Sequence, residues 1–464
     1  MRLLSLSSFA AIIAVAALAA CGSGSGGGST PVTPPGPTIA AVVAANSTAL
    51  ATIDPAAATD DADLAPFGAA VGNRRIVLLT EATHGDGATF ELKTRLVKYL
   101  HERKGFDVLF VESGMYDLAR IQQRQAAGGD SISMQAPGRI FYMFSRTVPG
   151  QLVLRYADAT RATATPLALW GHDVPMNGID STQSLVPNLQ AFLAARNSPS
   201  LQGADWPAYL RVAQQVVALK GTALASADAT AFLAMSAQLS NELCAEADTG
   251  GDLLQSPAFW CRMTEGVHAD YTHLFSASDA RTPTDLRDLV GAGNLEWLLD
   301  GRLAGHKAIV WLHAVHGNVG WAGFGSCAQA ASQECGPGFV NVGTELAHHF
   351  GDQAWIADIT AGSGTYDTYN ADSACGAPGP GFGFSAPGPA QLESYLGVGG
   401  QARFMAWPSD APSRQAIAPL GVREDEFRLR QPSNFGSGYQ GLFFIPTLAP
   451  TRTDCAAYPV IAYP

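Results

Sequence analysis

Six short, almost uninterrupted apolar runs constrain the fold of this chain more than any other feature. They are "RIVLLT" (75–80), "FDVLFVES" (106–113), "PLALWGHD" (166–173), "KAIVWLHA" (307–314), "QAWIADIT" (353–360) and "QGLFFIPT" (440–447). Strands that are covered on both faces read as continuous apolar runs, whereas half-exposed strands alternate with polar residues. Stretches with helical spacing separate several of these runs. The alternation predicts an α/β fold with a mainly parallel central sheet and helices on both faces.

The chain between about 183 and 302 differs from its surroundings. It is rich in alanine and carries no strand pattern, as in "WPAYLRVAQQVVALKGTALASADATAFLAMSAQLSNELCAEA" and "RDLVGAGNLEWLLDGRL". This composition is typical of helices. We therefore predict a helical insertion between the third and fourth strands, which covers a sheet edge and forms one wall of a cleft.

The first residues, "MRLLSLSSFAAIIAVAALAACGSGSGGG", have the order of an export signal: a basic residue, an apolar stretch and then small residues. A membrane-spanning helix is the alternative, because the apolar stretch is nearly long enough for one. The tetrapeptide "LAAC" resembles the lipobox of bacterial lipoproteins, which implies that Cys21 carries the lipid. We expect a signal peptide at 1–20, a Gly/Ser/Pro tether at 21–45 and the folded domain at 46–464, anchored to a membrane on the periplasmic or extracellular face of the cell envelope.

Six further cysteines remain after Cys21, and an even number fits disulfides in an exported chain. Pairing of near neighbours gives Cys244 with Cys261, Cys327 with Cys335, and Cys375 with Cys455. A zinc site is the alternative, but no C-x-x-C pair supports it. The net charge of −12 argues against a nucleic-acid partner and is compatible with a small neutral or cationic ligand.

Polar side chains follow the ends of four successive predicted strands. They are Glu81 and His84, then Glu112, then His172 and Asp173, then His313 and His316. In a parallel sheet these ends share one edge, and ligands bind in the crevice outside it. Each residue alone has a structural explanation, such as a helix cap for Glu81 or a hydrogen-bonded core position for a lone histidine. Their repetition indicates a shared site.

Several segments, taken in order, resemble the erythromycin esterase family. "LLTEATHGDGATFELKTRLVKYLHERKGFDVLFVESG" is similar to its G-E-x-T-H-G turn, helix and Glu-terminated strand. Its later segments are matched by "IFYMFSRT", "LALWGHDV", "IVWLHAVHGNVG", "ITAGSGTY" and "YQGLFFIPTLAPT". The resemblance spans most of residues 70–450. It implies an α/β fold and an enzyme that hydrolyses a small-molecule ester or lactone with activated water, as in enzymes that open the ring of macrolide antibiotics.

The resemblance also implies roles for particular residues. His84, Glu81, Glu112 and His313 are assigned to catalysis, and Lys93, Arg146, Asp173 and His316 to substrate binding. Neutral His84 would take a proton from water held near Glu81 or Glu112. Arg146, Lys93 or His313 would then stabilise the oxyanion. This mechanism uses no cofactor and no metal.

The sequence departs from the family pattern at four positions. Thr80 replaces a glycine, Lys93 the usual arginine, Ala314 an asparagine and His172 an aromatic residue. Lysine lacks the planar bidentate contacts of arginine, so we expect a different choice of substrate.

Two alternative functions stay open. Converging Glu and His side chains suit a metallohydrolase, and His313 or His316 suits the axial ligand of a haem-binding lipoprotein of the same fold class. A serine nucleophile is not indicated, because no G-x-S-x-G motif stands between a strand and a helix.

Overall fold

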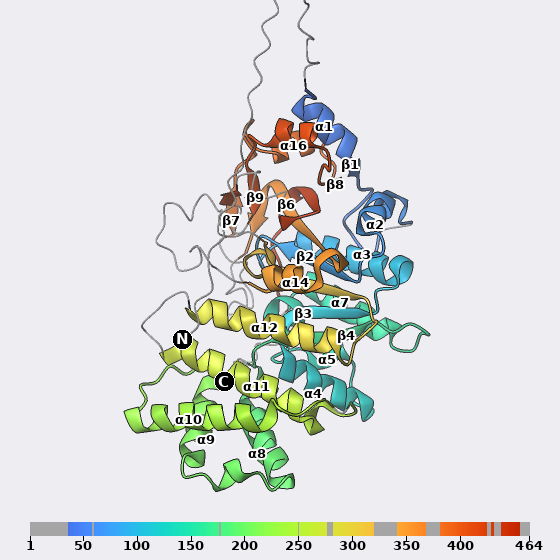
Figure 1. Ribbon diagram of the computed structural model, residues 1–464. Helices are drawn as coiled ribbons and strands as arrows, with labels where there is room; N and C mark the ends of the chain where they lie inside the picture. The colour runs from blue at the N-terminus through green and yellow to red at the C-terminus, as the bar shows by residue number, and fades with distance from the viewer. Residues whose placement is uncertain are drawn as a thin grey trace, which may run out of the picture. The chain divides into compact units, whose positions relative to one another are not determined.

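A computed structural model describes residues 36–57, 60–175, 178–248, 250–275, 282–319, 341–367, 381–424, 428–430 and 438–454. Within these residues the main sheet has nine strands in the order β1-β8-β11-β6-β2-β5-β3-β4, and β7 pairs with β6 (Figure 1). The predicted α/β class is confirmed.

The six predicted strands are present and adjacent in the sheet. They are β2 (Ile76–Glu81), β3 (Val108–Gly114), β4 (Ala168–Asp173), β5 (Ala308–His313), β6 (Ala354–Tyr366) and β11 (Gly441–Leu448). Every pairing among them is parallel. The short strands β1 (Ser47–Ala49), β7 (Phe382–Phe384) and β8 (Arg403–Ala406) pair antiparallel, and β9 (Val422–Glu424) and β10 (Arg428–Arg430) form a separate ribbon. A parallel core with antiparallel additions is therefore the architecture.

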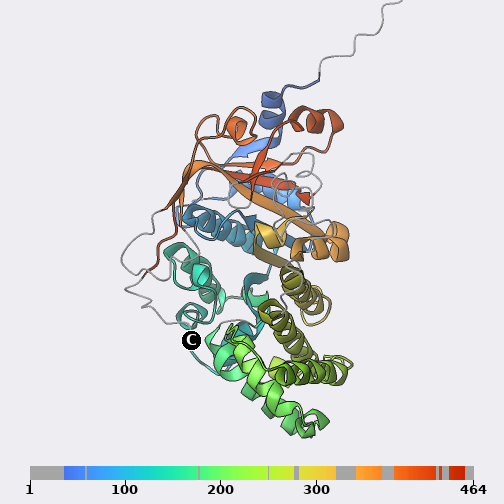
Figure 2. The same ribbon diagram turned by 90° about the vertical axis from the view of Figure 1, so that its left-hand side faces the viewer.

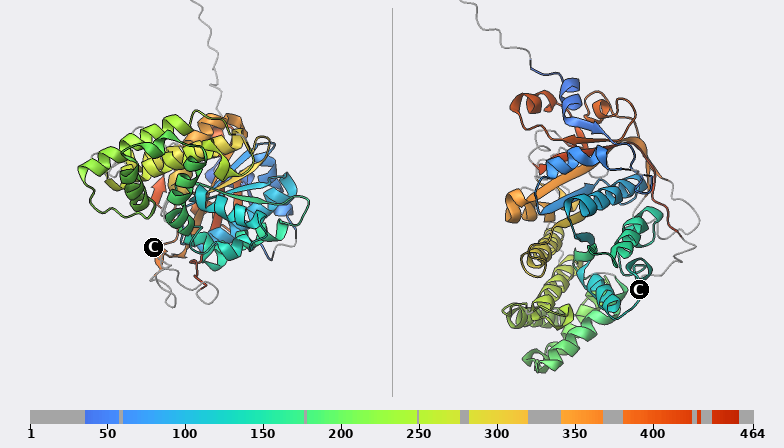
Figure 3. Two further views of the ribbon diagram at one scale, coloured as in Figure 1. Left: turned by 90° about the horizontal axis from the view of Figure 1, so that it is seen from below. Right: turned by 90° about the vertical axis from the view of Figure 1, so that its right-hand side faces the viewer.

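Helices cover both faces of this sheet, as the continuous apolar runs predict. Alternate residues of each strand feed two different cores: Ile76 and Leu78 join one, and Val77 and Leu79 the other. Figure 2 and Figure 3 show the helices packed on either side of the strands. Outside the insertion the helices are α1 (Ile39–Asn46), α2 (Ala65–Val71), α3 (Gly87–Lys104), α4 (Met115–Ala126), α5 (Ile132–Gln135), α6 (Tyr142–Ser145), α7 (Val148–Thr160), α13 (Ala314–Gly317), α14 (Val342–Phe350), α15 (Glu393–Leu396) and α16 (Ala411–Ile417).

The predicted helical insertion lies between β4 and β5. It contains α8 (Val186–Ala195), α9 (Trp206–Val217), α10 (Ser226–Leu243), α11 (Pro257–Phe275) and α12 (Thr282–Asp300). Helix α12 packs against β4, and α11 packs against α12, beyond the β4 edge of the sheet (Figure 1). A disulfide joins Cys244 to Cys261, which confirms that pairing. The pairs Cys327–Cys335 and Cys375–Cys455 fall outside the described residues.

The folded body begins earlier than the predicted boundary at residue 46. Helix α1 starts at Ile39, inside the predicted tether, where the Thr38 side chain accepts a hydrogen bond from the backbone N–H of Ala41. Val42 and Val43 then join the core, because this segment has apolar residues to bury. The first 35 residues, with Cys21 and the predicted signal peptide, lie outside the described structure. Among the described helices, none is both long and apolar enough to cross a membrane.

Candidate active site

The strand register brings seven of the eight predicted site residues together. Glu81 at the end of β2 lies opposite His313 at the end of β5, and Gly114 of β3 lies opposite Asp173 of β4. The cluster comprises Glu81, His84, Lys93, Glu112, Asp173, His313 and His316, and none of them is more than 7% exposed. The carboxyl edge of the parallel sheet is therefore a buried, highly charged centre.

The turn between β2 and α3 holds Glu81 and His84 without using either as a helix cap. Asp86 caps α3, since its Oδ1 accepts from the N–H of Ala88 at 3.0 Å. Glu81 Oε1 instead lies 3.0 Å from Nδ1 of His84. Both side chains are thus available to the cluster rather than to the helix end.

Lys93 extends from α3 beneath this turn. Its ammonium contacts the second carboxylate oxygen of Glu81, lies 3.3 Å from the carbonyl oxygen of Leu312, and packs 4.6 Å from the ring centre of Trp311. Burial lowers the pKa of Lys93 well below its usual value, against the opposing effect of nearby carboxylates. Lys93 therefore pairs with the oxygen of Glu81 that does not contact His84, and its side chain is fully buried.

The two nitrogens of His84 face different carboxylates. Nδ1 donates to Glu81, so in the neutral ring Nε2 carries the lone pair. That Nε2 is 3.7 Å from Oε1 of Glu112. Two hydrogen-bond acceptors thus lie close together, and both are within reach of a molecule placed beside them. A water molecule, which has two hydrogens to donate, matches this arrangement.

Glu112 is an ionised carboxylate at the middle of the cluster. Its Oε2 accepts from the backbone N–H of His313 at 2.8 Å, and its Oε1 is 3.5 Å from both His316 Nε2 and Arg287 Nη2. Burial would raise the pKa of Glu112, but its interactions with His316, His84 and Arg287 outweigh burial and hold the pKa well below its usual value. Glu112 is therefore a permanent proton acceptor at neutral pH.

His313 is held as a neutral ring with a defined tautomer. Its Nδ1 accepts from the N–H of Val315 at 3.1 Å and caps the short helix α13. Burial lowers the pKa of His313 well below its usual value, and a proton on the neighbouring His84 lowers it further. Because Nδ1 is an acceptor in a neutral ring, Nε2 carries the proton. The ring centres of His313 and His84 are 4.8 Å apart, so a donor lies beside the candidate base.

Two residues of the insertion complete the cluster, and sequence reasoning did not single them out. The guanidinium of Arg287 pairs with both carboxylate oxygens of Asp173, with Nε to Oδ1 at 3.0 Å. Asp288 Oδ1 lies 2.7 Å from Nδ1 of His316. Burial opposes protonation of His316, but Asp288 and Glu112 raise its pKa above the usual value. The sequence signal that could have identified these two residues is the adjacent Arg-Asp pair in an insertion predicted to form one wall of the cleft.

Arg146 is the predicted site residue that the cluster does not include. It follows α6 and is 1% exposed, and its backbone carbonyl accepts from the N–H of Asp454. The contacts described for the cluster do not extend to its side chain. A substrate-binding role for Arg146 stays a prediction.

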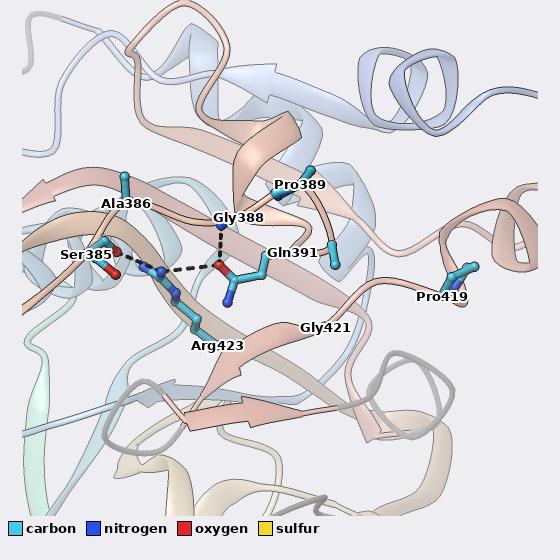
Figure 4. A pocket seen from close by; sticks show the side chains of 9 residues that line it. Ser385, Ala386, Gly388, Pro389, Gln391, Pro419, Gly421 and Arg423 are labelled. Carbon is cyan, nitrogen blue, oxygen red and sulfur yellow. Dashed lines mark hydrogen bonds between the residues drawn. The ribbon is translucent and has the colours of Figure 1, made fainter.

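A surface hollow of about 580 Å³ lies elsewhere and contains none of the cluster residues (Figure 4). Its one charged lining residue, Arg423, donates to the carbonyl oxygens of Gly362 and Ser385, both at 2.8 Å, and contacts Gln391. The guanidinium thus joins β6 to the loop after β7. These contacts give the arginine a structural role, and the hollow offers no acid–base pair.

Fold and site together define an α/β protein with a buried carboxylate–histidine centre at the carboxyl edge of its sheet. The family model for erythromycin esterase matches residues 101–428. This chain therefore belongs to the erythromycin esterase family.

Individual proteins resemble this chain either over a short segment of sequence or over most of the fold. A 44-residue segment is 54% identical to a putative hydrolase, YbfO, of Bacillus subtilis strain 168, but it covers only 10% of each protein. A Bacillus cereus protein of known crystal structure shares the fold, with a TM-score of 0.66 and 19% identity over 89% of this chain and 98% of its own. A succinoglycan biosynthesis protein matches with a TM-score of 0.64 and 16% identity, over 89% of this chain and 97% of its own. A mutant of the erythromycin esterase EreC, in its open conformation, matches with a TM-score of 0.62 and 14% identity, over 87% of this chain and 97% of its own.

Proposed function

We propose that this protein hydrolyses a carboxylic ester or lactone of a small molecule by using His84 to activate water. Family membership and the description of YbfO as a putative hydrolase support the class of reaction. The observation that carries the proposal is the position of His84, with Nδ1 on Glu81 and Nε2 facing Glu112. A base oriented by a carboxylate on its far nitrogen is the arrangement that general-base catalysis requires.

In the first step a water molecule lies beside Nε2 of His84 and Oε1 of Glu112 and bridges them. It donates one hydrogen to Nε2 of His84 and the other to Oε1 of Glu112. As the water oxygen attacks the ester carbonyl, Nε2 takes the proton, and Glu81 stabilises the imidazolium through Nδ1–H. His84 then returns this proton to the departing alkoxide, which balances the reaction and restores the neutral ring.

The developing oxyanion needs a donor close to His84. Of the three predicted donors, His313 is best placed, because its protonated Nε2 belongs to a ring 4.8 Å from that of His84. Lys93 is less suitable, since its ammonium is already covered by Glu81, Leu312 and Trp311. A fixed donor in a site that excludes water stabilises the transition state strongly.

A metal-dependent hydrolase is the second candidate, because Glu81, His84 and Glu112 can each offer an atom within 4.8 Å of the others. His84, however, presents Nδ1 to one carboxylate and Nε2 to the other, and one ion binds only one nitrogen of a ring. Lys93 also contacts Glu81. We therefore favour the metal-free reaction.

We further propose that the protein is exported and lipid-anchored through Cys21. The apolar first residues and the lipobox-like "LAAC" support this location. The disulfide between Cys244 and Cys261 adds support, since such bonds persist in oxidising compartments. Cys21→Ala should move the protein from the membrane fraction to the soluble fraction. Equal membrane association of both forms would contradict the anchor.

The test of the proposed function is a panel of lactones and simple esters assayed with wild-type protein. Product carboxylate should form with the wild type, without added metal. Dialysis against a strong chelator, with metal loss confirmed by elemental analysis, should leave the rate unchanged. Activity that disappears and returns with zinc or manganese would favour the metal-dependent candidate.

A further inference from the structure

Several buried polar atoms on the insertion side of the site lack a hydrogen-bond partner. Among the residues that the structure describes, they include both ring nitrogens of His172, Oδ2 of Asp270, Oδ2 of Asp288 and Oδ1 of Asn294. Each of these side chains is at most 3% exposed. Because an unsatisfied buried polar atom is costly, such a group indicates that a ligand or water belongs there.

Strand β4 and helix α12 place three of these side chains together. His172 immediately precedes Asp173, and Asn294 Nδ2 donates to the carbonyl oxygen of His172 at 2.8 Å. The imidazole packs against Gly291 on the same helix: a Cβ at this position would lie 3.4 Å from Nδ1 of His172. Asp288 lies one turn before Gly291. The imidazole therefore faces α12.

Helix α11 packs against α12 and carries Asp270. Gly266 packs so closely on the end of β4 that a Cβ there would lie 2.6 Å from Pro175. Asp270 follows one helical turn later and hence on the same face of the helix. Asp173 and Arg287 are the charged groups whose fields act on it. Arg287 also connects this region to Glu112, at 3.5 Å.

We propose that His172, Asp270, Asp288 and Asn294 form an insertion subsite that binds a neutral, hydroxyl-bearing part of the substrate, such as a diol or a sugar ring. This inference rests on the proposed function, because it takes the ligand to be the substrate of the His84 centre. It assigns His172 to substrate recognition, at a position where the family usually has an aromatic residue.

The hydrogen-bonding character of the subsite matches hydroxyl groups. Burial lowers the pKa of His172 to about 4, so the ring is neutral at neutral pH and offers one donor and one acceptor. Burial raises the pKa of Asp270 well above its usual value, which favours the protonated carboxyl, and that form offers the same pair. A hydroxyl group is likewise both donor and acceptor and satisfies either side chain.

The charges around the subsite disfavour ionic ligands. A cation would lie beside the guanidinium of Arg287. An anion would lie beside the carboxylates of Asp173 and Asp288. In a buried site an unpaired charge of either sign is costly, whereas a neutral hydroxylated group avoids both penalties.

The first test measures binding and does not depend on turnover. Protein with the His84→Ala change is titrated with methyl glucoside, glucuronate and glucosamine while the imidazole signals are followed by NMR. Methyl glucoside should bind best of the three and shift the His172 signals. His172→Phe or Asp270→Leu should weaken this binding about tenfold, the worth of one hydrogen bond. His268→Phe is the matched control, because His268 lies on α11 but is exposed, and it should leave binding unchanged.

Preferred binding of either charged sugar would overturn the subsite. So would a crystal structure in high methyl glucoside that shows ordered water alone on His172 and Asp270.

The second test separates the subsite from the hydrolase itself. In His172→Phe, the ratio of kcat/KM for a glycerol ester to kcat/KM for the matching ethyl ester should fall about tenfold, mainly through KM. Equal losses on both esters would assign His172 a structural role and overturn the proposal. If wild-type protein hydrolyses neither ester, the hydrolase function fails, whereas the binding titration still decides the subsite.

Discussion

The two sides of the site are built differently. On the strand side, Glu81, His84, Glu112 and His313 come from the sheet, and hydrogen bonds fix the orientation of each ring and carboxylate. On the insertion side, His172 and Asp270 keep polar atoms without partners in the described structure. Catalytic groups held in one orientation suit a reaction that needs one geometry, whereas unsatisfied atoms suit a group that arrives with the substrate. This contrast fits the two proposals above, in which the sheet supplies the chemistry and the insertion selects the substrate.

The largest effect should come from the strand side. Glu112→Gln removes the carboxylate that accepts from water and pairs with His316 and Arg287. We expect ester hydrolysis to fall about 100- to 1,000-fold while the protein stays folded. Steady-state kinetics and circular dichroism check this. A folded variant with full activity would show that Glu112 takes no part in the reaction.

The next effect concerns the ion cluster that joins the two sides. Arg287→Met leaves Asp173 without its bidentate partner. Removing one member of a buried pair costs about 3 to 5 kcal/mol, and the partial exposure of Arg287 places this case near the lower end, about 3 kcal/mol. Urea unfolding measures the loss. Arg287→Lys keeps the positive charge and should lower the free energy of unfolding by less. Equal stability of the Met and Lys variants would contradict this role of the charge.

The disulfide offers a way to loosen the insertion alone. Replacing Cys244 and Cys261 together by serine removes a crosslink with a sequence separation of 17 and should cost about 2 to 3 kcal/mol. Hydrogen exchange should accelerate in α10 and α11 and stay slow in β2, β3 and β5. Equal acceleration in the sheet would mean that the two sides unfold as one unit.

A smaller effect is the pH dependence contributed by His316. Its pKa is raised in the folded protein by Asp288 and Glu112, against burial. The proton is therefore held more tightly when folded, so the added stability is fully present below the ordinary pKa of about 6.5 and is lost as the pH rises through the raised value. The difference in unfolding free energy between wild type and His316→Gln should therefore shrink as the pH rises above about 6.5. A stability difference that grows with pH would mean that folding lowers the pKa of His316 instead of raising it.

Sequence patterns predicted the strand side well, because its residues follow directly from local order. An apolar run that ends in Glu or His, in a sheet whose strands are parallel, places that residue at one edge. Glu81, His84, Glu112, His313 and His316 were found in this way together with the family resemblance.

The residues on the insertion side come together only when separate helices pack on one another. The hydrophobic periodicity and the composition of the sequence do not predict that packing. Arg287 and Asp288 look like an ordinary solvated pair on an amphipathic helix until α12 packs against β4. Asp270 is similarly unremarkable in sequence, and its burial arises from the contact of Gly266 with the end of β4. Helix α1 was missed because the apolar segment after the Pro-rich stretch is too short to distinguish from a tether.

The most direct test of the central claim is the rate of ester or lactone hydrolysis by His84→Ala, measured beside wild type and the exposed-histidine control His268→Ala. The account predicts a loss of about 100- to 10,000-fold for His84→Ala, with an unchanged unfolding midpoint, and no loss for the control. A folded His84→Ala protein that hydrolyses the same substrate at the wild-type rate would contradict water activation by His84.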